Sequence, residues 1–214
     1  MLSKQIVRDA LKDSDKQPGL ACKTMNNETE GGRSSDNRET EMPEHVGNYR
    51  NGTDNGVAGE FIDLAGERYY VIHNADKIAP FFISVISDSD HWLFVSSTGG
   101  LTAGRVSPET ALFPYVTVDK IHDNAVHTGS KTLLHVNLDG RHYEWEPFNM
   151  EHDGLYVINR HLYKNLLGNK LCFEEINHDL QLVFRYTWAT SDNYGFIRQC
   201  ELQNLGENRV SVDM

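Results

Sequence analysis

Apolar and polar residues alternate most regularly between Thr132 and Glu146, and the alternation turns back on itself at Asp139-Gly140. An Asp-Gly pair tolerates the positive φ angles that a two-residue β-turn requires. The turn fixes the register of the hairpin, because residues equidistant from it face each other. One face then carries Leu134, Val136, Leu138, Arg141, Tyr143 and Trp145, and the other carries His135, Asn137, His142 and Glu144. One largely apolar face and one polar face are what a two-layer antiparallel sandwich requires of a strand pair.

The same period of two recurs in other short runs that are rich in aromatic and β-branched residues. The longest is Leu180–Thr190, where Leu182, Phe184, Tyr186 and Trp188 alternate with residues that include Gln181, Arg185 and Thr187. The other predicted strands are Glu60–Leu64, Arg68–Ile72, Pro80–Ser87, His91–Ser97, Tyr115–Asp119, Lys170–Ile176 and Tyr194–Asn204. Strands of this length, joined by turn residues, are typical of a large sandwich.

One segment departs from the strand pattern. Between His161 and Gly168, Leu162 and Leu166 are spaced like residues on one face of a helix, and Gly168 is a residue that often ends helices. We therefore expect one short helix at this place. The sequence as a whole predicts an all-β fold, a large antiparallel β-sandwich (super-sandwich) with at most one short helix.

The first part of the chain has a different composition. It consists mainly of Asn, Glu, Asp, Ser, Thr and Gly, and Tyr49 is its only Phe, Tyr or Trp residue. A segment so poor in apolar residues cannot offset the entropy lost on ordering. We expect residues 1–56 to be a disordered or extended leader, and residues 57–214 to form the β-sandwich domain.

Charge and composition limit the classes of partner. The 214 residues contain 31 acidic and 20 basic side chains, which gives a formal net charge of −11. Nucleic acids and anionic membranes bind basic patches, so neither is an expected partner. The three cysteines are too few for a disulfide framework, and the N-terminus lacks the apolar core of a secretory signal. We expect a cytoplasmic protein, and a neutral, polar ligand such as a sugar fits this charge better.

A glycine-rich segment follows the hairpin formed by Pro80–Ser87 and His91–Ser97. The run from Thr98 to Arg105 holds three glycines, which predicts a loop whose backbone can approach a ligand closely. Aromatic rings stack on the apolar faces of pyranoses, and arginine donates hydrogen bonds to several hydroxyl groups. The candidate sugar-binding residues are therefore Gly99, Gly100, Arg105, Trp92 and Tyr115.

These residues also carry a resemblance to a known family. The run FFISVISD, followed by WLFVSSTGG and then RVSPETALFPYVTVD, resembles the start of the N-terminal β-sandwich domain of the cellobiose and chitobiose phosphorylases (glycoside hydrolase family 94-like). That domain belongs to the galactose-mutarotase-like class. The segment Phe196–Gly206 is similar to a strand of these enzymes that closes on N-x-G. The similarity extends over about Gly59 to Met214.

The resemblance implies a non-catalytic role. In these phosphorylases the sandwich lends loops to an active site in a following (α/α) barrel, which holds the general acid, and it takes part in dimerisation. The implied ligand is a disaccharide or oligosaccharide, with inorganic phosphate only in the full-length enzyme, and no catalytic residue is carried over. The chain would then be part of a longer enzyme. Two alternatives remain, namely a free-standing carbohydrate-binding module and a mutarotase-like sugar epimerase.

Other chemical groups are interpreted as structural. His135, His142 and Glu144 share a polar strand face and are ligand types that zinc uses, but their spacing matches no known metal site, so we expect a solvated face. Arg198 falls on the predicted core face of its strand and should form an internal ion pair with Glu174 or Glu175. No phosphate-binding, dinucleotide or hydrolase motif is present, so we expect no metal and no cofactor.

Overall fold

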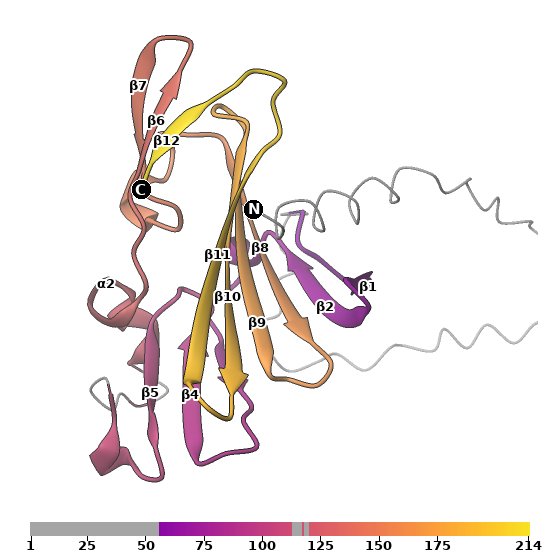
Figure 1. Cartoon of the computed structure of the whole chain (residues 1–214), viewed down its shortest axis with the longest axis vertical. Coiled ribbons are helices and arrows are strands. Elements are labelled where there is room, and N and C mark those ends of the chain that lie inside the picture. The colour runs from indigo at the N-terminus through magenta and orange to yellow at the C-terminus, as the bar shows by residue number, and fades with distance from the viewer. Residues whose placement is uncertain (1–55, 113–116, 118–119) are drawn as a thin grey trace, which may run out of the picture. The chain divides into compact units, whose positions relative to one another are not determined.

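Six antiparallel strands form the larger sheet, in the order β1-β2-β8-β9-β10-β11 (Figure 1). The computed structural model describes residues 56–112, 117 and 120–214, and all of them fall within one unit that begins at Thr53. The expected leader, Tyr115 and the strand predicted at Tyr115–Asp119 lie outside the described residues, apart from Thr117. The strands of the sheet are β1 (Ala58–Leu64), β2 (Glu67–His73), β8 (Ile158–Asn165), β9 (Lys170–Asn177), β10 (Leu182–Ser191) and β11 (Gly195–Asn204).

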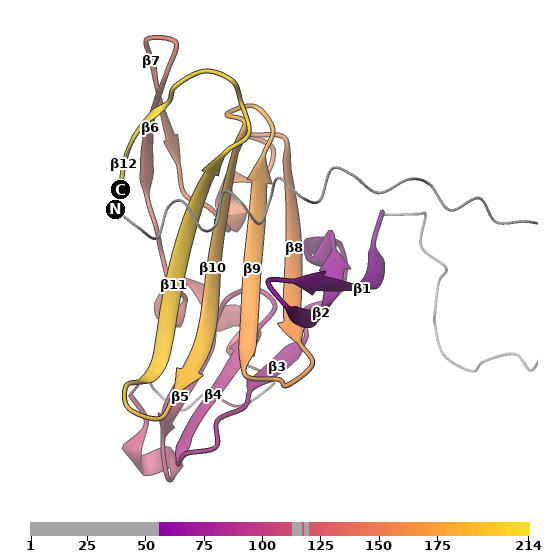
Figure 2. The ribbon, with the colours of Figure 1, turned by 45° about the vertical axis from the view of Figure 1, so that its right-hand side comes forward.

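Two three-stranded sheets form the second layer (Figures 1 and 2). One has the order β3-β4-β5 and the other the order β12-β6-β7. Their strands are β3 (Phe82–Val85), β4 (His91–Ser96), β5 (Leu101–Arg105), β6 (Leu134–Leu138), β7 (Arg141–Trp145) and β12 (Ser211–Asp213). The fold is thus the all-β, antiparallel sandwich that the alternation predicts.

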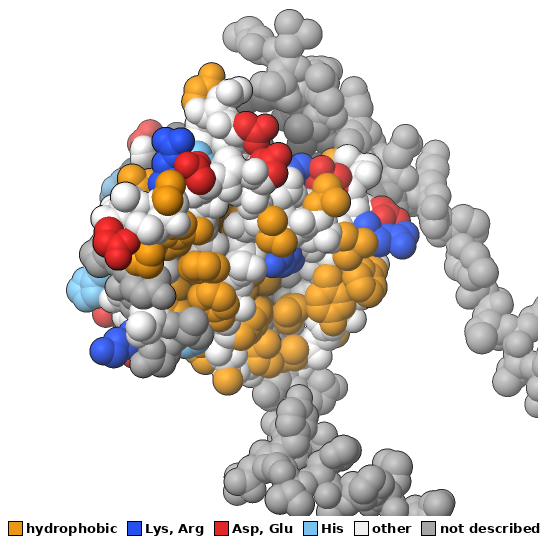
Figure 3. Space-filling view, turned by 90° about the horizontal axis from the view of Figure 1, so that it is seen from below, with side chains coloured by type: hydrophobic (Ala, Val, Ile, Leu, Met, Phe, Trp, Pro, Cys, Tyr) orange, Lys and Arg blue, Asp and Glu red, His pale blue; other side chains and the backbone are white. Residues whose placement is uncertain are grey.

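The core lies between the two layers. It takes alternate side chains from the strands that line it, as the pleat of a β-strand requires. The larger sheet contributes Leu162, Leu171, Phe173, Leu182, Phe184 and Tyr186, and the smaller sheets contribute Ile83, Val85, Leu93, Val95, Leu101, Ala103, Leu134, Val136 and Trp145. Hydrophobic side chains also gather on the outside, at one end of the sandwich (Figure 3).

The Asp-Gly hairpin confirms its predicted register. Leu134 pairs with Trp145 and Val136 with Tyr143, while His135 pairs with Glu144. Leu134, Val136 and Trp145 are buried, whereas His135, His142 and Glu144 are exposed. Asp139 and Gly140 have φ angles of 52° and 77°, as the turn demands.

We expect Gly140→Val to destabilise this hairpin by about 1 kcal/mol or more, because a β-branched residue resists positive φ. No atom lies within 4 Å of a Cβ added at Gly140, so the cost would come from the backbone alone. Chemical denaturation would measure the change in unfolding free energy. Gly140→Asn, which tolerates this conformation better, is the control, and equal stability of the two variants would contradict the argument.

The prediction of a helix at His161–Gly168 is wrong. This segment belongs to β8, which pairs with β2 on one side and β9 on the other. Leu162 is buried, but Leu166 is exposed and lies in the turn to β9, where Gly168 has a φ angle of 78°. The spacing of leucines that suggested a helix therefore joins a core residue to a turn residue.

The helix of the described residues lies elsewhere, at Ile121–Thr128. It consists of a 3-10 turn, Ile121–Asn124, that continues into α2 (Ala125–Thr128). Further 3-10 turns are Ala75–Lys77, Pro108–Thr110 and Met150–His152. Within the described part of the chain, no helix is both long enough and apolar enough to cross a membrane.

The predicted glycine-rich loop is shorter than expected. Leu101–Arg105 forms β5 and pairs with β4, so only the turn from Ser97 to Gly100 remains a loop. The missing side chain of Gly104 leaves room for the ring of Trp92, because a Cβ there would lie 2.4 Å from Cζ2 of that ring. The glycines of this run therefore serve a turn and a close packing contact.

Candidate functional site

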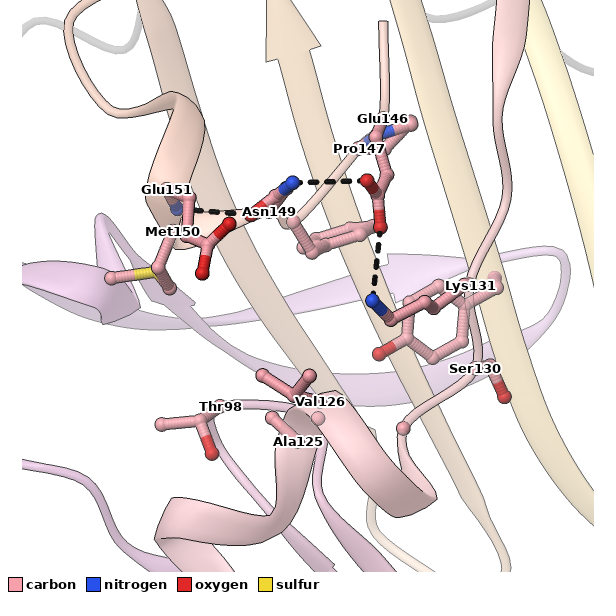
Figure 4. A pocket seen from close by; sticks show the side chains of 14 residues that line it. Thr98, Ala125, Val126, Ser130, Lys131, Glu146, Pro147, Asn149, Met150 and Glu151 are labelled. Carbon is pink, nitrogen blue, oxygen red and sulfur yellow. Dashed lines mark hydrogen bonds and ion pairs between the residues drawn. The ribbon is translucent and has the colours of Figure 1, made fainter.

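A small cleft opens where three segments of the second layer meet the larger sheet. These are the turn between β4 and β5, the helix Ile121–Thr128 and the segment 146–151 after β7 (Figure 4). Its volume is about 100 Å³. Ala125 and Val126 of the helix lie across the cleft from Glu146 and Asn149 (Figure 4).

A row of polar side chains forms one wall of the cleft. Glu146 lies at its centre, with one carboxylate oxygen 3.7 Å from Lys131 Nζ and the other accepting a hydrogen bond of 2.9 Å from Asn149 Nδ2. Asn149 Oδ1 in turn accepts from the backbone N–H of Glu151 at 2.9 Å. The row presents donors and acceptors side by side (Figure 4).

Aromatic side chains form the apolar part of the cleft. The ring of Tyr186 stacks on Phe173 with centroids 4.8 Å apart, and the ring of Phe148 meets Tyr186 edge-on at 5.1 Å. The guanidinium of Arg198 covers Tyr186 at 4.7 Å from the ring centroid. Burial raises the pKa of Tyr186. Tyr186 is thus a rigidly held phenol that lines the cleft.

A buried ion pair determines the path of the segment that carries this wall. Glu175 accepts hydrogen bonds from Arg160 Nε at 2.7 Å, Trp145 Nε1 at 2.8 Å and the backbone N–H of Phe148 at 2.7 Å. Arg160 also donates to the carbonyl of Asn149 at 3.2 Å. The segment of the cleft wall is therefore held in place by hydrogen bonds of its backbone to Glu175 and Arg160, whose charged side chains are buried.

A second hollow of 240 Å³ adjoins the cleft and shares Thr98, Phe148 and Met150 with it. Its lining is mostly apolar, and the polar groups on it include Asp76 and His161. His161 Nδ1 accepts a hydrogen bond of 3.1 Å from the backbone N–H of Asn74. Together the two hollows offer a mixed polar and apolar surface next to the turn of Gly99.

The pKa of His161 lies below the usual value of 6.5, mainly because burial disfavours the charged ring; neighbouring His73 lowers it further, while Glu174 and Asp76 oppose the shift. A histidine with a lowered folded-state pKa stabilises the fold above its unfolded pKa, and this stability is lost as the pH falls through 6.5 toward the folded value. We expect the denaturant concentration at the unfolding midpoint to fall between pH 7.5 and 5 in the wild-type protein, and to fall by a smaller amount in His161→Asn. Asparagine can still accept from Asn74, and an identical slope in both proteins would contradict this.

The structure places the predicted sugar-binding residues at two separate locations. Gly99 lines the cleft, with a φ angle of 92°. Gly100 is packed against the helix, since a Cβ there would lie 2.3 Å from the carbonyl oxygen of Ile121. Trp92 and Arg105 lie at the opposite end of the β4-β5 pair, where Arg105 Nε is 3.2 Å from Asp90. Tyr115 is outside the described residues.

The expected ion pair of Arg198 is wrong, although its place is as predicted, on the core-facing side of β11. It pairs across the sheet with Trp188 and donates to Thr132 Oγ1 at 3.2 Å. The two carboxylates that were expected as its partners bind other arginines, Glu174 with Arg185 and Glu175 with Arg160. Arg198 is instead accommodated over the ring of Tyr186.

The predicted polar face of the Asp-Gly hairpin is exposed, as described above. Across the described ranges, no group of three or more His, Cys, Asp or Glu side chains is arranged to hold a metal ion.

Sequence reasoning missed the residues of the polar wall and their support. Lys131 and Asn149 lie outside the predicted strands and Glu146 is the last residue of one, so alternation gives little information about them. A signal for the support did exist, because Glu175 falls in phase with the buried Leu171 and Phe173, and Arg160 in phase with Leu162. A carboxylate and a guanidinium on core-facing positions of adjacent strands predict a buried pair.

Comparison with known proteins does not extend this description. No family model matches the chain, and none of the curated proteins matches it.

Proposed function

We propose that the protein is a carbohydrate-binding module that holds a neutral saccharide in the cleft between Glu146 and the helix Ile121–Thr128. The observation that carries this proposal is the row of Lys131, Glu146 and Asn149 next to the partly exposed ring of Phe148. Sugars present hydroxyl groups at their edges and C–H groups on their faces, so such a site matches both.

The charges of the cleft favour a neutral ligand. Glu146 and Glu151 line it together with a single lysine, Lys131, and the net charge of the chain is −11. An anionic ligand would therefore enter an unfavourable potential. The adjoining hollow of 240 Å³ gives room for a ligand larger than the cleft alone would admit.

We propose binding rather than turnover. Acid-base cleavage of a glycoside needs two carboxyl groups that face one bond from opposite sides. The oxygens of Glu146 contact Lys131 and Asn149, which suits a fixed hydrogen-bonding role. We also propose that the protein is cytoplasmic, because its N-terminus lacks the apolar core of a secretory signal. Within a longer phosphorylase-type enzyme, as the family resemblance implies, this domain would hold a sugar and lend its loops to a catalytic barrel; as a free-standing module it would bind alone.

The test is a calorimetric titration of the protein with glucose, N-acetylglucosamine and their β-linked disaccharides. We expect Glu146→Ala to weaken binding by about tenfold, because it removes the central acceptor of the polar wall. Glu144→Ala, an exposed residue of the same hairpin, is the matched control and should bind normally. Absence of binding for every sugar, or equal losses in both variants, would refute the proposal.

A variant of Arg105 distinguishes between the two places where the predicted sugar-binding residues lie. Its ion pair with Asp90 is exposed on both sides, so Arg105→Ala should change the unfolding free energy by less than about 1 kcal/mol. If sugar binding depends on Arg105 and not on Glu146, the saccharide occupies the end of β5 near Trp92, and the cleft is not the site.

A further inference from the structure

One end of the sandwich exposes large apolar side chains (Figure 3). They come from the turns that join β3 to β4, β8 to β9 and β10 to β11, and from the chain after β5. We call them the apolar end patch, which consists of Ile86, Leu112, Leu166, Leu167 and Tyr194, with exposed fractions of 55%, 73%, 61%, 73% and 83%. Large exposed apolar patches mark interaction surfaces.

The segments that carry the patch are bonded to one another. The backbone N–H of Ile86 donates to the carbonyl of Gly168 in the β8-β9 turn at 2.9 Å, and Thr190 Oγ1 donates to the carbonyl of Ile86 at 3.2 Å. Hollows of 390 Å³ and 260 Å³ open beside the patch, one lined by Ile86 and Leu166 and the other by Leu112 and Tyr194. The patch is thus an ordered surface with recesses for side chains.

Three carboxylates lie in two of the segments that carry the patch. Asp88 and Asp90 lie in the loop between β3 and β4, and Asp192 lies in the turn between β10 and β11. A hydrogen bond between the carboxyl groups of Asp88 and Asp192 raises the pKa of Asp192, which shows how close the two acids are. The cations nearby are already bonded, because Arg105 donates to Asp90 and Lys164, which lines the hollow of Ile86 and Leu166, donates to the carbonyl of Ser84 at 2.7 Å.

This charge pattern selects the occupant. A second copy of the chain would bring the same three carboxylates against these, and an anionic membrane would be repelled in the same way. A partner surface with an apolar centre and Lys or Arg at its borders would match both the apolar side chains of the patch and its negative charge. Basic amphipathic helices have this arrangement, with apolar residues on one face.

We propose that the apolar end patch docks a basic amphipathic helix of a partner protein. The patch lies at the end of β5 that carries Arg105, whereas the proposed sugar cleft lies at the other end, next to Gly99. The two surfaces are therefore available at the same time, and the docking proposal does not depend on sugar binding.

The experiment uses a synthetic amphipathic helix of leucine and lysine as the probe, with a leucine and glutamate helix of the same pattern for comparison. Calorimetry on the full chain should show binding of the lysine helix that weakens with salt. Binding should fall about tenfold in Leu167→Ser/Tyr194→Ser and in Asp88→Asn/Asp192→Asn. Leu155→Ser, which removes a leucine of 66% exposure at the other end of β8, and Glu144→Gln are the matched controls and should bind as wild type does.

Three outcomes would overturn the proposal. The first is equal binding of both helices, and the second is an equal loss in the control variants, because each indicates general hydrophobic or charge attraction. The third is a dimer in sedimentation experiments that dissociates in Leu167→Ser/Tyr194→Ser, because the occupant would then be a second copy.

Discussion

Replacing Glu175 with alanine is expected to destabilise the fold by about 3 to 5 kcal/mol, the largest loss that we expect from a single polar side chain of this protein. Arg160 would keep its charge in the core, where it is only 6% exposed, without its closest carboxylate. The side chain of Trp145 and the backbone N–H of Phe148 would each lose an acceptor. Buried donors without partners carry their full cost of desolvation.

The variant should also lose the cleft before it loses the sandwich. Phe148 has a φ angle of 66°, an uncommon conformation for a residue with a side chain, and the bond to Glu175 helps to hold it there. Once that bond is absent, the segment 146–151 can relax, so sugar binding should disappear even at temperatures where the protein stays folded. Chemical denaturation and calorimetry together would separate the two effects.

Two controls make this prediction specific. Glu201→Ala removes an exposed partner of Arg185 at 3.5 Å and should cost less than about 1 kcal/mol. The double variant Arg160→Met/Glu175→Leu removes both charges and should recover part of the lost stability, since an apolar pair of similar volume avoids the desolvation of ions. A loss of less than 1 kcal/mol in Glu175→Ala would contradict the role that we assign to the pair.

Turn residues and strand alternation predicted those parts of the fold that depend on neighbouring residues in the sequence. The Asp-Gly turn specifies which residues of its two strands face each other, because a two-residue loop permits one register. The hairpin between β1 and β2 follows the same logic, with Ala65 and Gly66 at φ angles of 50° and 82°. In β10, the alternation of Leu182, Phe184 and Tyr186 with other residues located the core face correctly.

The spacing of residues gave the wrong secondary structure where pairing with distant strands determines it. The leucines of β8 satisfy a helical period by coincidence, and the strand wins because β2 and β9 supply hydrogen bonds on both sides. Glycine content likewise suggested a loop at 101–105, yet that segment forms β5. The residues of a segment do not show which other strands will pair with it.

The candidate site was only partly accessible to prediction. The sequence correctly predicted a loop at Gly99, but Lys131 and Glu146, which line the same cleft, come from the two ends of a hairpin. They meet the turn of Gly99 only because the smaller sheets lie side by side on the larger one (Figure 1). Such a meeting depends on the order of strands, which alternation does not encode.

Gly100 illustrates the same limit, and its replacement gives the second large effect that we expect. The sequence suggested that the glycine lets backbone approach a ligand. The structure instead brings the helix to it, because an added Cβ would lie 2.3 Å from the carbonyl oxygen of Ile121 and 3.0 Å from the amide nitrogen of Ala125. Both are backbone atoms, so the helix must move as a unit to relieve the contact.

We therefore expect Gly100→Ala to cost about 1 to 3 kcal/mol, as overpacking usually does, and to weaken sugar binding through the displacement of Ala125 and Val126. Gly59→Ala is the matched control, because its Cβ would meet only the end of the exposed Tyr70 side chain, at 2.1 Å, and that side chain can rotate away. Its cost should stay within about 0.5 kcal/mol. Thermal unfolding of both variants, followed by titration with the best-bound sugar, measures the two effects. If Gly100→Ala is as stable as Gly59→Ala, the helix does not pack on the turn as described, and the wall of the cleft that it forms would have to be placed elsewhere.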